Sequence, residues 1–302
     1  MTLPNFLIIG AAKSGTTALY RYLKQHPDIF MSERKEPHFF SFTNETKMTR
    51  GPGDYVKTAI TDFNLYCKLF DSVKNEIAIG EASPTYIYIK GTAERIYSIL
   101  PNVKLLAILR NPVDRAFSAY MHQVRDGYED SKDFKEALSK ENERIKNNWG
   151  PIWHYVNAGY YYEQLIPYFN SFNKDNIKII IYDDFVKNPI KEIKNIYSFL
   201  GVDDSYIPDM SVKPNVSGIP KHKTWQIIID FLFNHPNPIR SISRKIFSEE
   251  YRWKVTSIIR NKNLIKPIIP LSLRLELIEL YKNDILNLQN LINYDLSIWL
   301  SN

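Results

Sequence analysis

The chain has 302 residues, of which 44% are hydrophobic and 14% aromatic, so it holds enough apolar material for one large folded domain. Lysine and arginine total 39 against 33 acidic residues, and this net charge of +6 suits anionic ligands. The sequence has no arginine-rich run, RNA-binding signature or zinc-finger spacing, so no nucleic-acid partner is predicted.

Location and metal content can also be predicted. No apolar segment approaches the ~18 residues that a membrane span needs. The first expected strand begins at Phe6, too early for the charged and apolar regions of a signal peptide. The single cysteine, Cys67, excludes an intramolecular disulfide and favours a reducing compartment. We therefore expect a cytoplasmic protein with no membrane span and, because no Cys/His cluster has metal-site spacing, no metal.

The first element is a strand over 6–9, which runs into a turn of small residues and then into a helix with Leu19 and Leu23 four apart. The first turn of such a helix presents free backbone N–H groups and the positive end of its dipole. Lys13 adds a full charge, and hydroxyl donors follow at Ser14, Thr16 and Thr17. The segment therefore predicts a phosphate or sulfate site.

The turn differs from the loop that binds ATP in P-loop proteins, G-x-x-x-x-G-K-[ST]. Gly10 and Gly15 keep the glycine spacing, but Thr16 stands at the lysine position and the lysine lies three residues earlier, at Lys13. An ordinary strand-to-helix turn with a surface lysine is the alternative interpretation of the glycine spacing alone.

The next informative stretch is Glu36-Pro37-His38-Phe39-Phe40. Residues two apart in an extended chain face the same side, so Glu36 and His38 could form one wall of a cleft. A loop carrying solvated charges is the alternative, and for Glu36 alone it is the simpler one.

A helix is expected over 53–70 and a short strand over 77–80, directly followed by Glu81. The nearly continuous apolar run over 104–109 predicts a buried parallel strand. Arg110 follows that strand, at the edge where open α/β sheets bind ligands. A helix beginning at Pro112 then carries two polar residues on one face, Ser118 and His122.

The remaining pattern predicts three helices and one more strand, over 133–149, 160–172, 177–182 (the strand) and 189–200. A loop over 202–220 leads into a basic stretch over 221–266 that includes Lys221 and Lys223, and a final helix over 271–300 is expected to break near Asn293. Alternating strands and helices predict an α/β fold with a parallel sheet flanked by helices on both faces. We expect one domain over 1–302, with a core over 1–202.

The two anion-binding motifs, Gly10 to Thr17 and Arg110-Asn111-Pro112 with Ser118, stand about 100 residues apart in the order found in sulfotransferases that use 3′-phosphoadenosine 5′-phosphosulfate (PAPS). The chain resembles that family, which implies a P-loop-like sheet. The resemblance implies that Arg110 and Ser118 bind the 3′-phosphate. It also implies a basic loop over the nucleotide, with Lys221 and Lys223, and a 5′-phosphosulfate site made by Lys13, Ser14, Gly15, Thr16 and Thr17.

The segment around Glu36 is similar to that of heparan sulfate–type members, in which the glutamate is a general base. The resemblance implies the same role for Glu36, with His38 and His122 orienting the sulfuryl group or the acceptor, and a structural role for Glu81. The chain departs from that group at Ala82, where a lysine is usual, and lacks its disulfide-bearing loop. Its C-terminal segment looks more like soluble bacterial members.

The implied activity is transfer of a sulfuryl group from PAPS by in-line displacement to an acceptor hydroxyl or amine. The expected acceptor is a carbohydrate, glycolipid or small metabolite. Two other functions remain open from the residues: a P-loop kinase or NTPase, and a non-catalytic protein that binds a nucleotide or a sulfated glycan. Thr16 at the lysine position and Arg110 in place of a magnesium-binding aspartate argue against the kinase.

Overall fold

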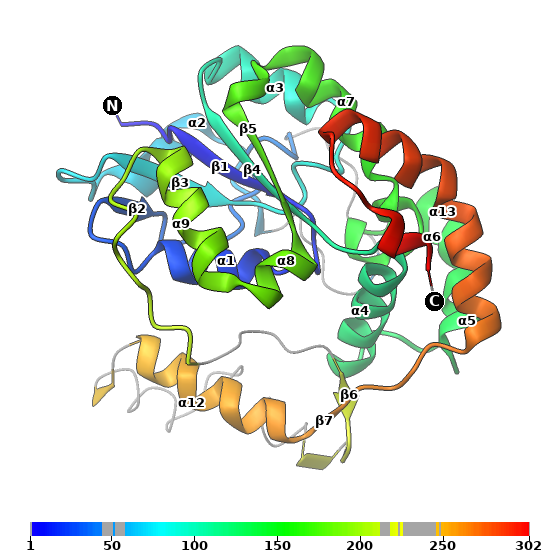
Figure 1. Cartoon of the computed structure of the whole chain (residues 1–302). Helices are drawn as coiled ribbons and strands as arrows, with labels where there is room; N and C mark the ends of the chain where they lie inside the picture. Colours follow the sequence, from blue (N-terminus) through cyan, green and yellow to red (C-terminus); the bar gives the residue numbers. More distant parts are fainter. Residues whose placement is uncertain are drawn as a thin grey trace.

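The computed structural model describes residues 2–43, 51, 58–211, 218–222, 224–225, 246–247 and 249–301. A five-stranded parallel sheet lies at its centre, in the order β2-β3-β1-β4-β5 (Figure 1). The strands are β1 Phe6–Gly10, β2 Ile29–Met31, β3 Ala78–Ala82, β4 Lys104–Leu109 and β5 Ile177–Ile181. β1 is thus the middle strand, paired with β3 on one side and β4 on the other.

Helices cover both faces of the sheet, which confirms the predicted α/β architecture. Side chains alternate along β1: Leu7 and Ile9 join a core with α3, α4, α7 and α13, whereas Phe6 and Ile8 join a second core with α1, α8 and α9. The helices that build the first core are α3 Thr92–Ile99, α4 Pro112–Arg125, α7 Tyr161–Ser171 and α13 Leu271–Ile292. Those of the second are α1 Thr16–Leu23, α8 Tyr182–Lys187 and α9 Pro189–Leu200.

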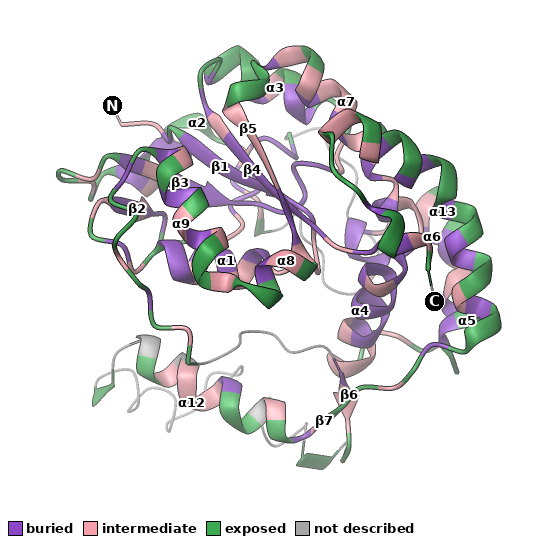
Figure 2. Ribbon diagram, viewed as in Figure 1, coloured by how far each residue is buried: buried purple, intermediate pink, exposed green. Residues whose placement is uncertain are grey.

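Burial follows this layering. The central strands are buried on both sides, and the outer faces of α3, α9 and α13 are exposed (Figure 2). All five residues of β1 are buried, as the continuous apolar run of a two-sided parallel strand requires. Cys67 is also buried, as a small core residue of α2 (Phe63–Cys67).

Several predicted boundaries are confirmed. α9 spans 189–200 and ends at Gly201, whose φ of 84° is the left-handed conformation that favours glycine. α4 begins with Pro112 in its first turn, capped by the Asn111 side chain. The final helix stops at Asn293, which has a φ of 50°. A short 3₁₀ turn, Ser297–Leu300, follows.

Two expected helices were wrong in extent. The helix expected over 53–70 begins in the described part of the chain only at Phe63, because the Asp62 side chain caps it by accepting from the Leu65 N–H; residues 52–57 lie outside the described ranges. The helix expected over 133–149 is two short helices, α5 Phe134–Ser139 and α6 Glu141–Lys146.

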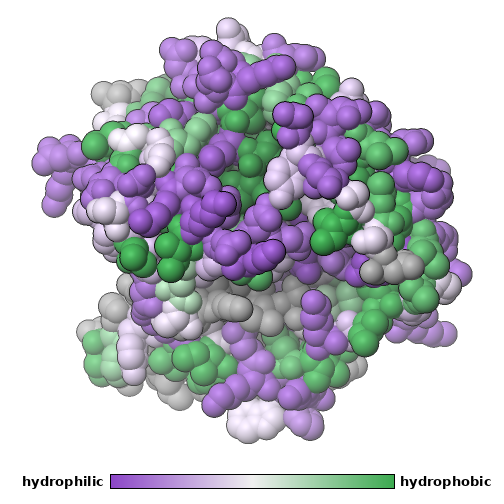
Figure 3. All heavy atoms as spheres, in the orientation of Figure 1, coloured by the Kyte–Doolittle hydropathy of each residue, from purple (hydrophilic) through white to green (hydrophobic). Residues whose placement is uncertain are grey.

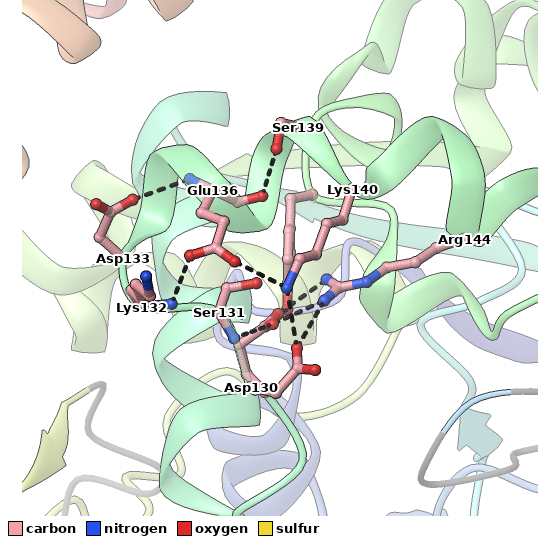
Figure 4. A network of polar contacts seen from close by, with 10 residues as sticks. Asp130, Ser131, Lys132, Asp133, Glu136, Ser139, Lys140 and Arg144 are labelled. Atoms are coloured by element: carbon pink, nitrogen blue, oxygen red, sulfur yellow. Dashed lines mark hydrogen bonds and ion pairs between the residues drawn. The ribbon is translucent and has the colours of Figure 1, made fainter.

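A polar network fastens α5 and α6 to the segment that follows α4 (Figure 4). Arg144 donates two hydrogen bonds, of 2.8 and 2.7 Å, to the carboxylate of Glu129, which also accepts from the Tyr155 hydroxyl. Lys140 reaches both Asp130 and Glu136. Since Glu129 and Arg144 are almost fully buried, this region is an anchored support for α4 rather than a solvated helix face.

The C-terminal region differs from the expected loop. Within 202–220, Ile219–Pro220 forms a short strand, β6, that pairs antiparallel with β7, Leu264–Ile265. α12, Glu249–Lys262, lies beside them (Figure 1). Figure 3 shows a largely hydrophilic face with hydrophobic side chains interspersed near α12. No helix in the described ranges is both long and apolar enough to cross a membrane.

Candidate active site

The topology places the candidate site at the carboxyl edge of the sheet. From β1 the chain leaves through α1 toward β2, and from β4 it leaves through α4 toward β5, so adjacent strands send their connections in opposite directions. Ligands of open α/β sheets bind at such a switch point. Here it brings the loop after Gly10 next to Arg110, whose Nη1 lies 3.5 Å from the Lys13 carbonyl oxygen.

The loop has the form of an anion cradle. Gly15 has a φ of 101°, a left-handed conformation that favours glycine, and a Cβ there would make a tight contact, 3.2 Å from the Tyr182 ring. α1 then begins at Thr16, and the N–H groups of Gly15, Thr16 and Thr17 donate no hydrogen bond to any described residue. These free N–H groups can donate hydrogen bonds to the oxygens of a phosphate or sulfate.

A cavity of 430 Å³ opens beside this loop. It brings together most of the residues that the sequence singled out, and these line its wall: Lys13, Gly15, Thr16, Thr17, Glu36, Arg110, Ser118 and His122. Because they come from three segments that are far apart in the sequence, 13–17, 36 and 110–122, their convergence is not a consequence of sequence proximity.

Three other expected site residues among those described, Ser14, His38 and Lys221, do not line the cavity. Ser14 is fully buried, and its N–H closes the turn onto the Ala11 carbonyl. His38 is also buried. Lys221 is exposed and its N–H pairs with the Asn263 carbonyl oxygen. Lys223 lies outside the described residues.

Lys13 lines the cavity and is partly buried, with a left-handed φ of 70°. Burial lowers the pKa of Lys13 to about 7, and the positive charge of Arg125 adds to the effect. At this pKa, Lys13 is only partly protonated near neutral pH, and an anion that binds beside it stabilises the protonated form.

Glu36 also lines the cavity, with its side chain 34% accessible. Its N–H is anchored on the Ala82 carbonyl oxygen at the end of β3, and its carboxylate pairs with Lys35. Burial alone would raise the pKa of Glu36, but the charge and hydrogen bond of Lys35, together with the charge of Lys13, outweigh burial and lower the pKa. Glu36 is therefore an ionised carboxylate, able to accept a proton.

His38 stands behind Glu36 and supports it. Its Nε2 is 3.8 Å from the Glu36 carboxylate, and its Nδ1 is 2.8 Å from the Thr85 hydroxyl. Burial lowers the pKa of His38 to about 4, so the ring is neutral. Glu36 and His38 both have positive φ, 62° and 56°, a backbone conformation that non-glycine residues adopt mainly where the surroundings enforce it.

Glu81 is fully buried and does not line the cavity. Its carboxylate accepts hydrogen bonds from three hydroxyl groups, those of Ser83 at 2.9 Å, Tyr66 at 3.4 Å and Tyr86. Burial raises the pKa of Glu81 to about 7. This geometry makes Glu81 part of the packing that supports β3 and leaves Glu36 as the carboxylate that faces the cavity.

One end of the cavity is aromatic and apolar. The Arg110 guanidinium lies over the Tyr182 ring, 4.9 Å from its centre, and Phe185 and Met210 also line this end. The sequence pattern predicts a strand through Tyr182, whereas the structure ends β5 at Ile181 and begins α8 at Tyr182, whose side chain lines the cavity.

Two arginines of α4 were missed by the sequence interpretation. Arg115 lines the cavity although its side chain is 99% buried, and it donates to the Tyr155 carbonyl oxygen. Arg125 contacts His122 and Asp126 at the end of α4. Their helical spacing gave a signal, since positions 115, 118, 122 and 125 recur at three and four and so share one face.

Acidic, histidine and cysteine side chains of the described residues form no group of three or more that could hold a metal ion. The site is thus built, in the part of the chain described, from cations, backbone N–H groups, hydroxyls and one exposed carboxylate.

Comparison with known proteins agrees with this architecture. The sulfotransferase domain model matches residues 3–217. The crystal structure of a sulfotransferase from Alicyclobacillus acidocaldarius is 36% identical in sequence, covers 99% of both chains and has a TM-score of 0.78.

Two curated relatives are more distant. The membrane-associated sulfotransferase kil1 of Dictyostelium discoideum is 29% identical over an alignment of 202 residues that covers 58% of this chain and 40% of kil1. Human heparan sulfate glucosamine 3-O-sulfotransferase 6 is 27% identical over 202 residues, 66% of this chain and 52% of the enzyme. The chain therefore spans about half the length of these relatives. The family match over 3–217, together with the similarity to the bacterial structure along its whole length, shows that the chain belongs to the sulfotransferase domain family.

Proposed function

We propose that this chain transfers a sulfuryl group from PAPS to a hydroxyl of its acceptor. The observation that carries the proposal is the convergence in one cavity of the free N–H groups at the start of α1, Lys13, the Arg110–Ser118 pair and the ionised Glu36. The first three suit a donor that carries several anionic groups, and the last suits an acceptor that must lose a proton.

The donor would lie along the loop and the aromatic end. The N–H groups of Gly15, Thr16 and Thr17 would hold the 5′-phosphosulfate, and Arg110 with Ser118 the 3′-phosphate. Tyr182 lies at the same end as Arg110, so its ring would lie near the adenine base of the donor. Contributions from Ser14, Lys221 and Lys223 remain predictions from the resemblance.

The chemistry required of the protein is modest, because the leaving group of PAPS is a phosphate. As the acceptor oxygen bonds to sulfur, the bond from sulfur to the phosphate oxygen breaks, and 3′-phosphoadenosine 5′-phosphate (PAP) leaves with the electron pair. Glu36 takes the acceptor proton, a role worth ~10²–10⁴-fold in rate. Lys13 and the loop N–H groups stabilise the charge that grows on the phosphate.

The proposed acceptor is a hydroxylated carbohydrate or small metabolite. The names of curated relatives, heparan sulfate glucosamine 3-O-sulfotransferase 6 and carbohydrate sulfotransferase 15, support a carbohydrate. Ala82 stands where heparan sulfate–type members usually have a lysine, and its side chain is fully buried. We therefore propose a glycan other than heparan sulfate. A cytoplasmic location also stays a prediction, since one relative is called membrane-associated.

The kinase and the non-catalytic binder were the alternatives from the sequence. Membership of the sulfotransferase family argues against the kinase. Against the binder, both Lys13 and Glu36 face the cavity rather than being lost or buried away from it.

A first test uses nucleotide selectivity. PAP should stabilise the protein far more than ADP does, because Arg110 and Ser118 provide a place for the additional phosphate. A ligand that binds only the folded state stabilises it by ~2.7 kcal/mol at a hundredfold excess over Kd. Thermal unfolding with each nucleotide measures the difference, and equal shifts would contradict the assignment of Arg110 and Ser118.

A second test uses pH. Lys13 has a pKa of about 7 without ligand, and an adjacent dianion must raise that pKa, so PAP binding should take up a proton above pH 7. The Kd for PAP is therefore expected to rise with pH between 7 and 9, by up to about tenfold per unit. Calorimetric titration across this range should show the slope in the wild type and its loss in Lys13→Met. A wild-type Kd that does not change with pH would contradict the role of Lys13.

A further inference from the structure

The end of α4 carries a chain of three polar side chains beside the cavity. Arg125 places Nη2 at 2.5 Å from His122 Nδ1, and the same guanidinium bonds the Asp126 carboxylate through Nε at 2.8 Å and Nη2 at 3.3 Å. The Arg125 side chain is only 15% accessible, and Asp126 is the C-cap residue of the helix. The guanidinium is thus held on one side by a carboxylate and directed at the imidazole on the other.

This contact fixes which ring nitrogen carries hydrogen. A guanidinium has donors only, so His122 Nδ1 must be the acceptor, and the hydrogen of the neutral ring then lies on Nε2. Burial, together with the charges of Lys13 and Arg125, holds the pKa of His122 well below its usual value, so the ring is neutral. The competing arrangement is donation from Nδ1 to Asp126 Oδ2 at 3.4 Å, a longer contact than that to Arg125.

His122 lines the same cavity as Lys13 and Glu36, and its Nε2 bonds no described residue. We infer that Arg125 is a positioning residue that keeps His122 in the Nε2–H form, so that His122 donates a hydrogen bond to an oxygen of the sulfuryl group in transfer. The sulfuryl group as the partner of His122 rests on the proposed sulfotransferase function. The tautomer of His122 rests only on its contact with Arg125.

The consequence for the reaction is a division of roles. An Nε2–H group can stabilise negative charge on a sulfuryl oxygen, but it has no lone pair on that nitrogen and cannot take the acceptor proton. The proton therefore goes to Glu36. Without Arg125, Asp126 would accept from Nδ1–H, and Nε2 would present a lone pair to the anionic oxygens, which repels them.

Nitrogen NMR of histidine-labelled protein tests the tautomer without any substrate. The wild type should show His122 protonated at Nε2, identified by its absence in His122→Gln. Arg125→Met should move the hydrogen to Nδ1, Arg125→Lys should keep it on Nε2 because an ammonium also only donates, and Asp126→Asn should leave it on Nε2. A wild-type His122 protonated at Nδ1 would overturn the inference.

Activity provides the second measurement. Arg125→Met should lower kcat about 10²-fold, comparable to loss of one oxyanion donor, with Arg125→Lys recovering most of it. The matched control is Arg274→Met. Arg274 lies on α13 with its side chain 25% accessible, its guanidinium pairs with Asp114 of α4, and it does not line the cavity. Equal losses in Arg125→Met and Arg274→Met would show a structural role only. If the wild type shows the Nε2–H tautomer but transfers no sulfuryl group, the proposed function is wrong, and so is donation from His122 to a sulfuryl oxygen. The role of Arg125 in setting the His122 tautomer would still stand.

Discussion

Replacing Lys13 with alanine is expected to lower kcat by at least ~10²-fold, because the ammonium meets negative charge that grows on the leaving phosphate during transfer. An interaction that strengthens in the transition state affects kcat, whereas one that is equal in the ground state affects mainly KM. Lys13 lies in the loop between β1 and α1. Its left-handed backbone indicates that the surrounding structure holds it in this conformation. Steady-state kinetics at saturating PAPS measures the effect.

Arg110→Ala is the matched control for Lys13→Ala. Arg110 is proposed to hold the 3′-phosphate, whose charge does not change in the reaction, so the KM for the donor should rise while kcat stays near the wild-type value. Loss of kcat in Arg110→Ala with intact donor affinity would contradict this division between the two cations.

Glu36→Gln is expected to show the other large effect. The amide keeps the shape of the carboxylate and removes its basicity, so sulfuryl transfer should fall by at least ~10² while PAP affinity is retained. Glu36 is the carboxylate that opens on the cavity, and the ion pair with Lys35 keeps it ionised. Single-turnover transfer at saturating PAPS and calorimetric titration with PAP separate the two readouts.

Glu81→Gln provides the comparison for Glu36→Gln. Glu81 is buried among the hydroxyls of Tyr66, Ser83 and Tyr86, so its replacement should mainly reduce stability, by ~1–3 kcal/mol, because an amide nitrogen cannot accept from these donors. Near-normal transfer by Glu36→Gln, with loss of transfer in a folded Glu81→Gln, would show that Glu81 is the base.

The sequence identified those parts of the site whose signal is local. A strand, a glycine pair and a helix start are contiguous between Phe6 and Leu23, and their pattern predicted the anion loop. Arg110 and Ser118 were found in the same way, since a strand end and the helix after it are read from one segment. The parallel sheet also followed, because apolar runs and helices alternate along the chain.

What the sequence did not show depends on contacts between distant segments or on hydrogen-bond direction. His38 was expected beside Glu36 on one face of an extended chain, but the positive φ of both residues places it behind the carboxylate, against Thr85. The helix expected over 133–149 gave no sign that two of its charged residues, Glu141 and Arg144, are buried, with Glu141 accepting from the backbone N–H groups of Val156 and Asn157. The Arg125–His122 contact required coordinates, because spacing alone does not tell which partner donates.

The activity proposed for this chain is transfer of a sulfuryl group from PAPS. Incubation with ³⁵S-labelled PAPS and a panel of carbohydrate, glycolipid and small hydroxylated acceptors, with chelator present, measures it directly. Labelled product and an equal amount of PAP are expected for at least one acceptor, and the rate of formation of both should fall by at least ~10²-fold in Lys13→Ala. Contradiction would come from a chain that transfers no label from PAPS but moves the terminal phosphoryl group of ATP in a magnesium-dependent reaction.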